Sequence, residues 1–232
     1  GMDLYNAIAI NTQYPFIVSI SKGFCRAHTP SDTYNTKSKC QYNEFTEFSK
    51  NYSKNIALVI YSQTPDRLFT KPSMEQVTER DLNLNSVKQV ANYLGILKNE
   101  NNIEVIMLGM LPILKEHPID WNYAKPFDQQ IDGLISNRTL ELTKFVDSTF
   151  ERILRKKDIP YYPKIEAASI DLSVDLMFEG KITYSDKRHL SSAGEKLFGS
   201  RIVKYLEERG YKLFNSKGED MASMWSSMDK PS

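Results

Sequence analysis

The stretch IALVIY at residues 56–61 decides the fold class of this chain. It is a continuous apolar and β-branched run with no polar alternation, which is typical of a parallel strand that helices cover on both faces. The polar residues 62–65 (SQTP) end it. A second run, IEVIMLGM at residues 103–110, predicts the next strand, and Pro112 ends that one. The sequence therefore predicts a sheet that is buried on both sides.

Segments with apolar residues at helical spacing alternate with these runs. The predicted helices are 3–11, 42–52, 84–98, 139–157 and 192–208. Further strands are predicted at 15–21 (PFIVSIS) and from Ile159 onward. Strands that alternate with helices predict an α/β fold, a three-layer α/β/α sandwich with a mostly parallel central sheet. In such sheets, reactive groups gather at the carboxyl ends of the strands.

Two signals bound the last predicted helix. Ser192 and Glu195 fit a capping box, with a hydroxyl at the N-cap and a carboxylate three residues later. Gly210 is expected to end the helix. We therefore expect one domain over residues 2–210 and a C-terminal extension over 211–232. In that extension a short strand at 211–214 precedes either a docked helix or a disordered tail.

Composition excludes several classes of function. The 232 residues suit one α/β domain, and 30 basic against 29 acidic residues leave a formal net charge of +1. A net charge this small produces no overall electrostatic field that would favour binding to nucleic acid or to an anionic membrane surface. No run approaches the roughly 18 apolar residues that span a bilayer, and no signal peptide opens the chain. We expect no nucleic-acid partner and no membrane insertion of this chain.

The two cysteines, Cys25 and Cys40, lie in one polar loop. A disulfide between them would indicate an oxidising compartment, whereas two free thiols in a reducing cytosol would have the same sequence. A zinc site needs more ligands than these two and His28 supply, so we expect no metal.

The segment YSDKRHLS at residues 184–191 carries the strongest chemical signal. Asp186 precedes His189 by three positions, in a loop that leads into a helix. There the carboxylate can accept a hydrogen bond from one ring nitrogen while the other faces a cleft, the arrangement of a general base for a hydroxyl nucleophile. The alternative is a solvated polar loop, because Asp-x-x-His also recurs by chance. His28 and His117 are expected to be ordinary loop residues.

The block at residues 184–194 resembles the Asp-x-x-His-Leu-Ser-x-x-Gly segment of the SGNH (GDSL-like) hydrolase superfamily. The closest resemblance is to the extracytoplasmic SGNH domain at the C-terminus of membrane acyltransferase family 3 proteins. Three further segments support it: the strand and proline exit at 105–112, the buried run at 56–61, and the cysteine loop at 23–25. The resemblance extends over most of residues 2–209.

The resemblance implies an SGNH (flavodoxin-like) fold and a Ser-His-Asp esterase or O-acyltransferase that acts on a cell-envelope glycan. His189 would be the general base and Asp186 would orient it. Ser62 and Gln63 follow the buried strand, where the family places oxyanion-stabilising or substrate-binding residues. Ser62 lacks the glycines of a nucleophile elbow and is expected to be a turn residue. No cofactor is implied. The implied location is bacterial, periplasmic or otherwise extracytoplasmic, with a membrane acyltransferase domain as partner.

The chain departs from the family at the nucleophile. No Gly-Asp-Ser tripeptide occurs in the sequence. The family's serine follows the first strand and precedes the first helix, so the expected first strand and its serine would lie upstream of Met2. The alternative is a degenerate SGNH-like module that binds glycan or docks on a membrane acyltransferase. A third reading is an intracellular α/β protein with reduced cysteines.

Overall fold

The computed structural model describes residues 2–11, 42–63, 68–70, 77–122, 124–125, 134, 136–211 and 213. The predicted strand at 15–21, both cysteines and His28 lie outside these residues, as does most of the predicted C-terminal extension. Those predictions stay predictions.

Three parallel strands form the central sheet of the described residues, in the order β1, β2, β3. They are β1 (Val59–Tyr61), β2 (Val105–Leu108) and β3 (Tyr161–Tyr162). Met107 in the middle strand pairs with Tyr61 on one side and with Tyr161 on the other. The first two strands are shorter than the apolar runs that predicted them, because only part of each run pairs with a neighbouring strand.

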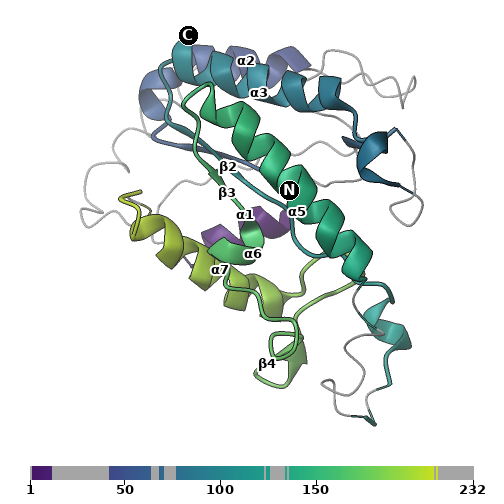
Figure 1. Cartoon of the computed structure of the whole chain (residues 1–232). Helices are drawn as coiled ribbons and strands as arrows, with labels where there is room; N and C mark the ends of the chain where they lie inside the picture. The colour runs from purple at the N-terminus through teal and green to yellow at the C-terminus, as the bar shows by residue number, and fades with distance from the viewer. Residues whose placement is uncertain are drawn as a thin grey trace, which may run out of the picture.

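Helices cover both faces of this sheet (Figure 1). Among the described residues the α-helices include α1 (Met2–Ala9), α2 (Tyr42–Asn51), α3 (Leu84–Asn99), α5 (Asn137–Arg155), α6 (Lys164–Ala167) and α7 (Ser192–Glu207). Short 3-10 helices lie at η1 (Ser53–Asn55), η3 (Glu79–Asp81) and η4 (Pro118–Asp120). Helices α3 and α5 lie on one side of the sheet, and α1, α6 and α7 lie on the other (Figure 1). The predicted α/β/α class with a parallel sheet is confirmed.

Strand β2 explains why its sequence is continuously apolar. Val105 and Met107 pack into the core beneath α3 and α5, while Ile106 and Leu108 pack into the core beneath α7. Successive side chains of a strand point to opposite faces, so a strand between two helix layers needs apolar residues at every position. All four side chains are at most 1% exposed.

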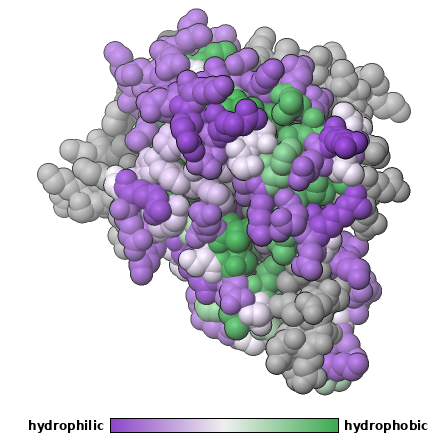
Figure 2. Space-filling model, viewed as in Figure 1, coloured by the Kyte–Doolittle hydropathy of each residue, from purple (hydrophilic) through white to green (hydrophobic). Residues whose placement is uncertain are grey.

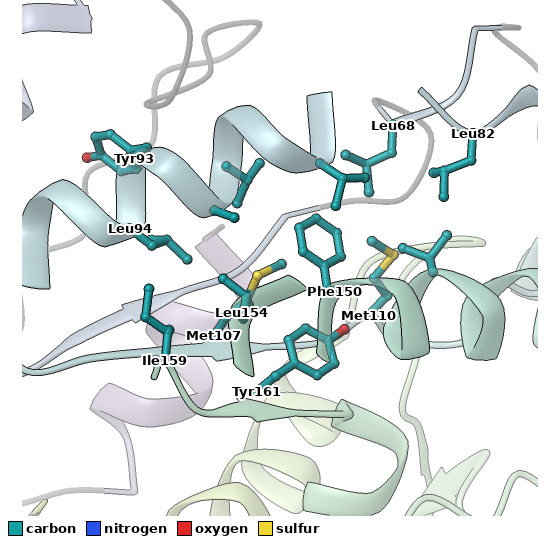
Figure 3. Packing of buried hydrophobic residues seen from close by; sticks show 14 of the residues in the cluster. Leu68, Leu82, Tyr93, Leu94, Met107, Met110, Phe150, Leu154, Ile159 and Tyr161 are labelled. Atoms are coloured by element: carbon teal, nitrogen blue, oxygen red, sulfur yellow. The ribbon is translucent and has the colours of Figure 1, made fainter. Parts of the chain in front are cut away.

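The core beneath α3 and α5 is seen from close by in Figure 3. Phe150 of α5 stacks on Tyr161 of β3, with ring centroids 6.0 Å apart and planes 7° from parallel. Leu94 of α3 belongs to the same core and lies above Ile159 (Figure 3). The outer surface is mostly hydrophilic on the face that Figure 2 shows, with small apolar areas between the polar residues, as is usual for a globular domain.

A β-hairpin after α6 was not predicted from the sequence. Its strands are β4 (Met177–Phe178) and β5 (Lys181–Ile182), which pair antiparallel. The turn residues Glu179 and Gly180 have φ values of 51° and 73°, as a two-residue hairpin turn requires. The only local signal was Gly180, which lies between the pairs Met177-Phe178 and Lys181-Ile182. Helix α6, a single turn, was also missed.

The N-cap of α7 is Ser191, which corrects the predicted capping box at Ser192 and Glu195. The Ser191 hydroxyl accepts a hydrogen bond from the Gly194 N–H at 3.3 Å. Glu195 is therefore not a capping residue, and its carboxylate accepts a hydrogen bond from the Asn6 side chain of α1 at 2.9 Å. Gly210 follows the helix with a φ of 89°, as expected for a residue that ends it.

Helices α1 and α7 approach each other closely at Gly199. A Cβ added at this position would lie 2.1 Å from the Ala7 carbonyl oxygen, too close for any side chain. Gly95 of α3 offers a contrast, because its added Cβ would make only ordinary contacts of 3.6 Å with the Lys157 side chain. The two glycines are both helical, but only Gly199 is required by packing.

Gly199→Ala is expected to lower the free energy of unfolding by about 1–3 kcal/mol, because the added methyl pushes α1 away from α7. The matched control, Gly95→Ala, should be neutral or stabilising by up to about 1 kcal/mol, since alanine is the better helix former. Urea unfolding followed by circular dichroism measures both. Equal effects of the two substitutions would contradict the close approach.

Candidate functional site

The carboxyl ends of the three strands meet at one edge of the sheet. Ser62 follows β1, Gly109 follows β2, and Lys164 comes two residues after β3. Because the strands are parallel and in register, these residues lie at the same edge. Ligands of open α/β sheets bind outside this edge, so a functional site is expected there.

The segment that carries His189 is a tight loop closed by backbone pairing. Tyr184 and Leu190 form an antiparallel bridge. The Ser185 N–H donates to the His189 carbonyl at 2.9 Å, and the Ser191 N–H donates to the Thr183 carbonyl at 2.9 Å. The loop is therefore held at its base immediately before α7 begins.

Two contacts fix this loop against the chain that leaves β2. The Leu114 N–H donates to the Lys187 carbonyl at 2.9 Å. The buried Tyr184 hydroxyl donates to the Pro112 carbonyl at 3.3 Å. Since residues 109–114 continue from the carboxyl end of β2, the His189 loop lies on the side of the sheet edge where the sequence predicted it.

Asp186 organises the loop through both carboxylate oxygens. Oδ2 lies 2.6 Å from Nδ1 of His189. Oδ1 accepts hydrogen bonds from the backbone N–H groups of Arg188 at 2.7 Å and of His189 at 2.8 Å. The expected contact between the ring and the carboxylate is thus present, and the catalytic role of the pair stays a prediction.

Electrostatics favour an ionised Asp186. Partial burial raises its pKa, but the hydrogen bonds from the His189 ring and from the two backbone N–H groups together lower it more, so the pKa lies below the ordinary 3.8. An ionised carboxylate at Nδ1 accepts the ring N–H there and leaves Nε2 as the proton acceptor. The His189 side chain is 55% exposed, so the ring is open to solvent.

Ser62 and Gln63 form a second polar group at the same edge. The Ser62 hydroxyl oxygen accepts a hydrogen bond from the ammonium of Lys164 at 2.8 Å. The Gln63 side-chain oxygen accepts one from the Tyr61 hydroxyl at 3.0 Å, and its Nε2 is enclosed without a hydrogen-bond partner among the described residues. Lys164 was not predicted from the sequence as a site residue. Its position directly after Pro163, at the end of the predicted strand, was the available signal.

A buried carboxylate lies beneath this group. Burial raises the pKa of Asp147 to about 6, although the Tyr161 hydroxyl, the Met110 N–H and the charge of Lys164 each lower it. The Tyr161 hydroxyl donates to Asp147 Oδ1 at 2.5 Å. Gly109 leaves room for this pair, because a Cβ there would lie 2.7 Å from the Tyr161 hydroxyl and 2.9 Å from Asp147 Oδ1.

The other described histidine, His117, lies in a loop outside this site. His117 caps η4, where its Nδ1 accepts a hydrogen bond from the Ile119 N–H at 3.1 Å, as is usual for a loop residue.

Within the described ranges, no group of three or more His, Cys, Asp or Glu side chains is arranged to hold a metal ion. None of the described helices is both long and apolar enough to cross a bilayer. A polar pocket that includes Lys98, Glu104 and Asp158 lies at the opposite, amino-terminal edge of the sheet.

Comparisons with known proteins give distant structural likenesses only. No protein-family profile and no curated protein sequence matches the chain. The carbohydrate acetylesterase Est24 from Sinorhizobium meliloti shares 12% identity and a TM-score of 0.41, over 75% of this chain and 72% of that one. The native aryl esterase of M. smegmatis shares 12% identity and a TM-score of 0.42, over 80% and 74% of the two chains. The inhibitor-bound form of the same aryl esterase shares 14% identity and a TM-score of 0.40, again over 80% of this chain and 74% of that one. We base the fold class on the sheet order and helix layers rather than on likenesses of this size.

Titration of Asp147 should make stability depend on pH. Its folded pKa of about 6 lies above the ordinary 3.8, so the folded state holds this proton more tightly than the unfolded chain. The protonated Asp147 carboxyl therefore adds to the free energy of unfolding below about pH 4, and this contribution is lost as pH rises through 6. Relative to Asp147→Asn, the wild type should therefore lose on the order of 3 kcal/mol of unfolding free energy between pH 4 and pH 7.5.

Urea unfolding at several pH values between 4 and 7.5 measures this difference. Asp158→Asn is the control. The exposed Asp158 has a pKa lowered by its hydrogen bond and charge pairing with Lys98, so any stability it contributes is lost only as pH falls below about 4. Its difference from the wild type should therefore stay nearly constant between pH 4 and pH 7.5. A difference between wild type and Asp147→Asn that does not change with pH would contradict the raised pKa.

Proposed function

We propose that this domain handles acyl esters, as an SGNH-type hydrolase or O-acyltransferase that acts on a cell-envelope glycan. The observation that carries the proposal is the Asp186–His189 pair. It lies in a sequence block that resembles the SGNH catalytic segment, at the carboxyl-end side of a parallel sheet, with an exposed imidazole.

The geometry supports a definite division of roles. Asp186 accepts the Nδ1–H of His189 and fixes the tautomer, so that Nε2 takes the proton from a serine hydroxyl as that serine attacks the acyl carbonyl. The ionised carboxylate stabilises the imidazolium that forms. His189 then returns the proton to the departing alkoxide, and an acyl-enzyme remains. Water completes a hydrolysis, and a sugar hydroxyl completes a transfer.

The nucleophile in this proposal is a serine of a Gly-Asp-Ser block that would precede Met2. The family carries its serine just before the first helix. Here α1 packs against α7, the helix that follows the His189 loop. This packing connects the segment that would carry the serine with the helix next to the proposed base. The proposal includes an extracytoplasmic location and a membrane acyltransferase domain as partner.

His189→Ala is expected to lower the rate at which an upstream-extended chain hydrolyses a small aryl acetate by at least a hundredfold, the effect of removing a general base. The control is His117→Ala, which removes the other described histidine and should leave the rate within about twofold. Release of the aryl alcohol, followed by absorbance, gives kcat and KM. Unchanged turnover in His189→Ala would remove this residue from the mechanism.

The missing Gly-Asp-Ser tripeptide favours a second candidate, a non-enzymatic module that binds glycan or docks on an acyltransferase. The genomic reading frame upstream of Met2 separates the two candidates. A Gly-Asp-Ser there supports the enzyme, and a translation start at Met2 supports the binding module.

A further inference from the structure

Lys164 places a positive charge at the centre of the sheet's carboxyl edge. It is the first residue of α6 and is only 7% exposed. Its ammonium donates to the Ser62 hydroxyl oxygen at 2.8 Å. Ser62 follows β1 and Lys164 follows β3, so this hydrogen bond connects the two strands that flank β2. A hydrogen bond that involves a charged group is stronger than a neutral one.

The bond also directs the Ser62 hydroxyl. Because its oxygen accepts a hydrogen bond from Lys164, its own hydrogen points elsewhere, and none of the residues that the structure describes accepts it. A hydroxyl that accepts a charge-assisted hydrogen bond becomes a stronger donor itself. Ser62 is half-buried, at the edge where ligands of open α/β sheets bind.

Gln63 adds a second donor. The Tyr61 hydroxyl occupies its side-chain oxygen and so orients the amide. Its Nε2 is enclosed and has no acceptor among the residues that the structure describes. Such unsatisfied buried donors are rare in folded proteins. An oxygen of a ligand would satisfy this one once the side chains that cover it move aside, as interface side chains commonly do on binding.

Asp147 decides between two roles for Lys164. The carboxylate is buried and interacts electrostatically with the lysine. Burial disfavours the ammonium form of a lysine and a nearby opposite charge favours it. Here the nitrogen donates to the Ser62 oxygen, whereas a base that activates Ser62 as a nucleophile must be a neutral amine that accepts the hydroxyl proton. The lysine therefore acts as a positive charge behind two donors, and this combination suits an acceptor-only, negatively charged ligand.

We propose that Ser62, Gln63 and Lys164 form a subsite for a carboxylate carried by a sugar, so that the preferred glycan is acidic. The inference rests on the proposed function, which supplies the glycan. The Ser62 hydroxyl and the Gln63 amide each donate to one carboxylate oxygen, and Lys164 acts through Ser62 and through its charge. The subsite lies at the same sheet edge as the His189 loop, so an acidic residue of the glycan and the ester can be bound together.

Titration of the 232-residue chain with D-glucuronate, D-glucose and acetate at neutral pH tests the subsite, by NMR or calorimetry. Glucuronate should bind at least tenfold more tightly than glucose or acetate. Ser62→Ala and Lys164→Met should each weaken glucuronate binding by about tenfold or more, as expected for a lost hydrogen bond to a charged group. Lys144→Met, at an exposed lysine that pairs with Glu141 on α5, is the matched control and should bind as the wild type does.

Equal affinity for glucuronate and glucose, or undiminished binding by Ser62→Ala, overturns the subsite. Acetate binding as tight as that of glucuronate overturns the assignment to a sugar. Ser62→Ala keeps the buried charge and removes a single oxygen, so it decides the matter if Lys164→Met does not fold by circular dichroism. Glucuronate binding is measured without turnover, so it tests the subsite independently of catalysis. A rate of aryl acetate hydrolysis that His189→Ala leaves unchanged would contradict the proposed function but would not affect the binding result.

Discussion

The burial of β2 on both faces is the constraint on which the rest of this structure depends. Its four side chains alternate between two helix layers and are almost completely excluded from water. A strand in this position cannot carry polar side chains, since none could reach solvent or a helix cap. Polar chemistry is therefore confined to the edges of the sheet, where the chain leaves the strands.

The carboxyl edge gathers that chemistry from distant parts of the sequence. Asp186 and His189 are held by a loop that packs on the chain leaving β2, and Lys164 reaches Ser62 across the same strand. Each group is fixed by backbone hydrogen bonds or by a buried charged partner rather than by its own flexibility. Such preorganisation is what a site for charge-developing reactions requires.

Local patterns predicted the elements that tertiary packing reinforces. The apolar runs gave the strands β1 and β2, and the helical spacing gave α3, α5 and α7 to within about two residues at each end. The β4–β5 hairpin was missed because its four strand residues are too few for a periodic signal. The N-cap of α7 was misplaced by one position because Ser191 and Ser192 are adjacent serines, and only the backbone geometry distinguishes them.

The sequence by itself determined the α/β class and the contact between Asp186 and His189. The class follows from the period of the apolar residues, and the contact joins side chains only three residues apart. The tertiary structure alone decided that Lys164 meets Ser62 across 102 positions, that Tyr161 donates to Asp147, and that Gly109 and Gly199 must lack side chains. These contacts come from strand order and helix packing, which bring together residues whose local sequences carry no information about each other.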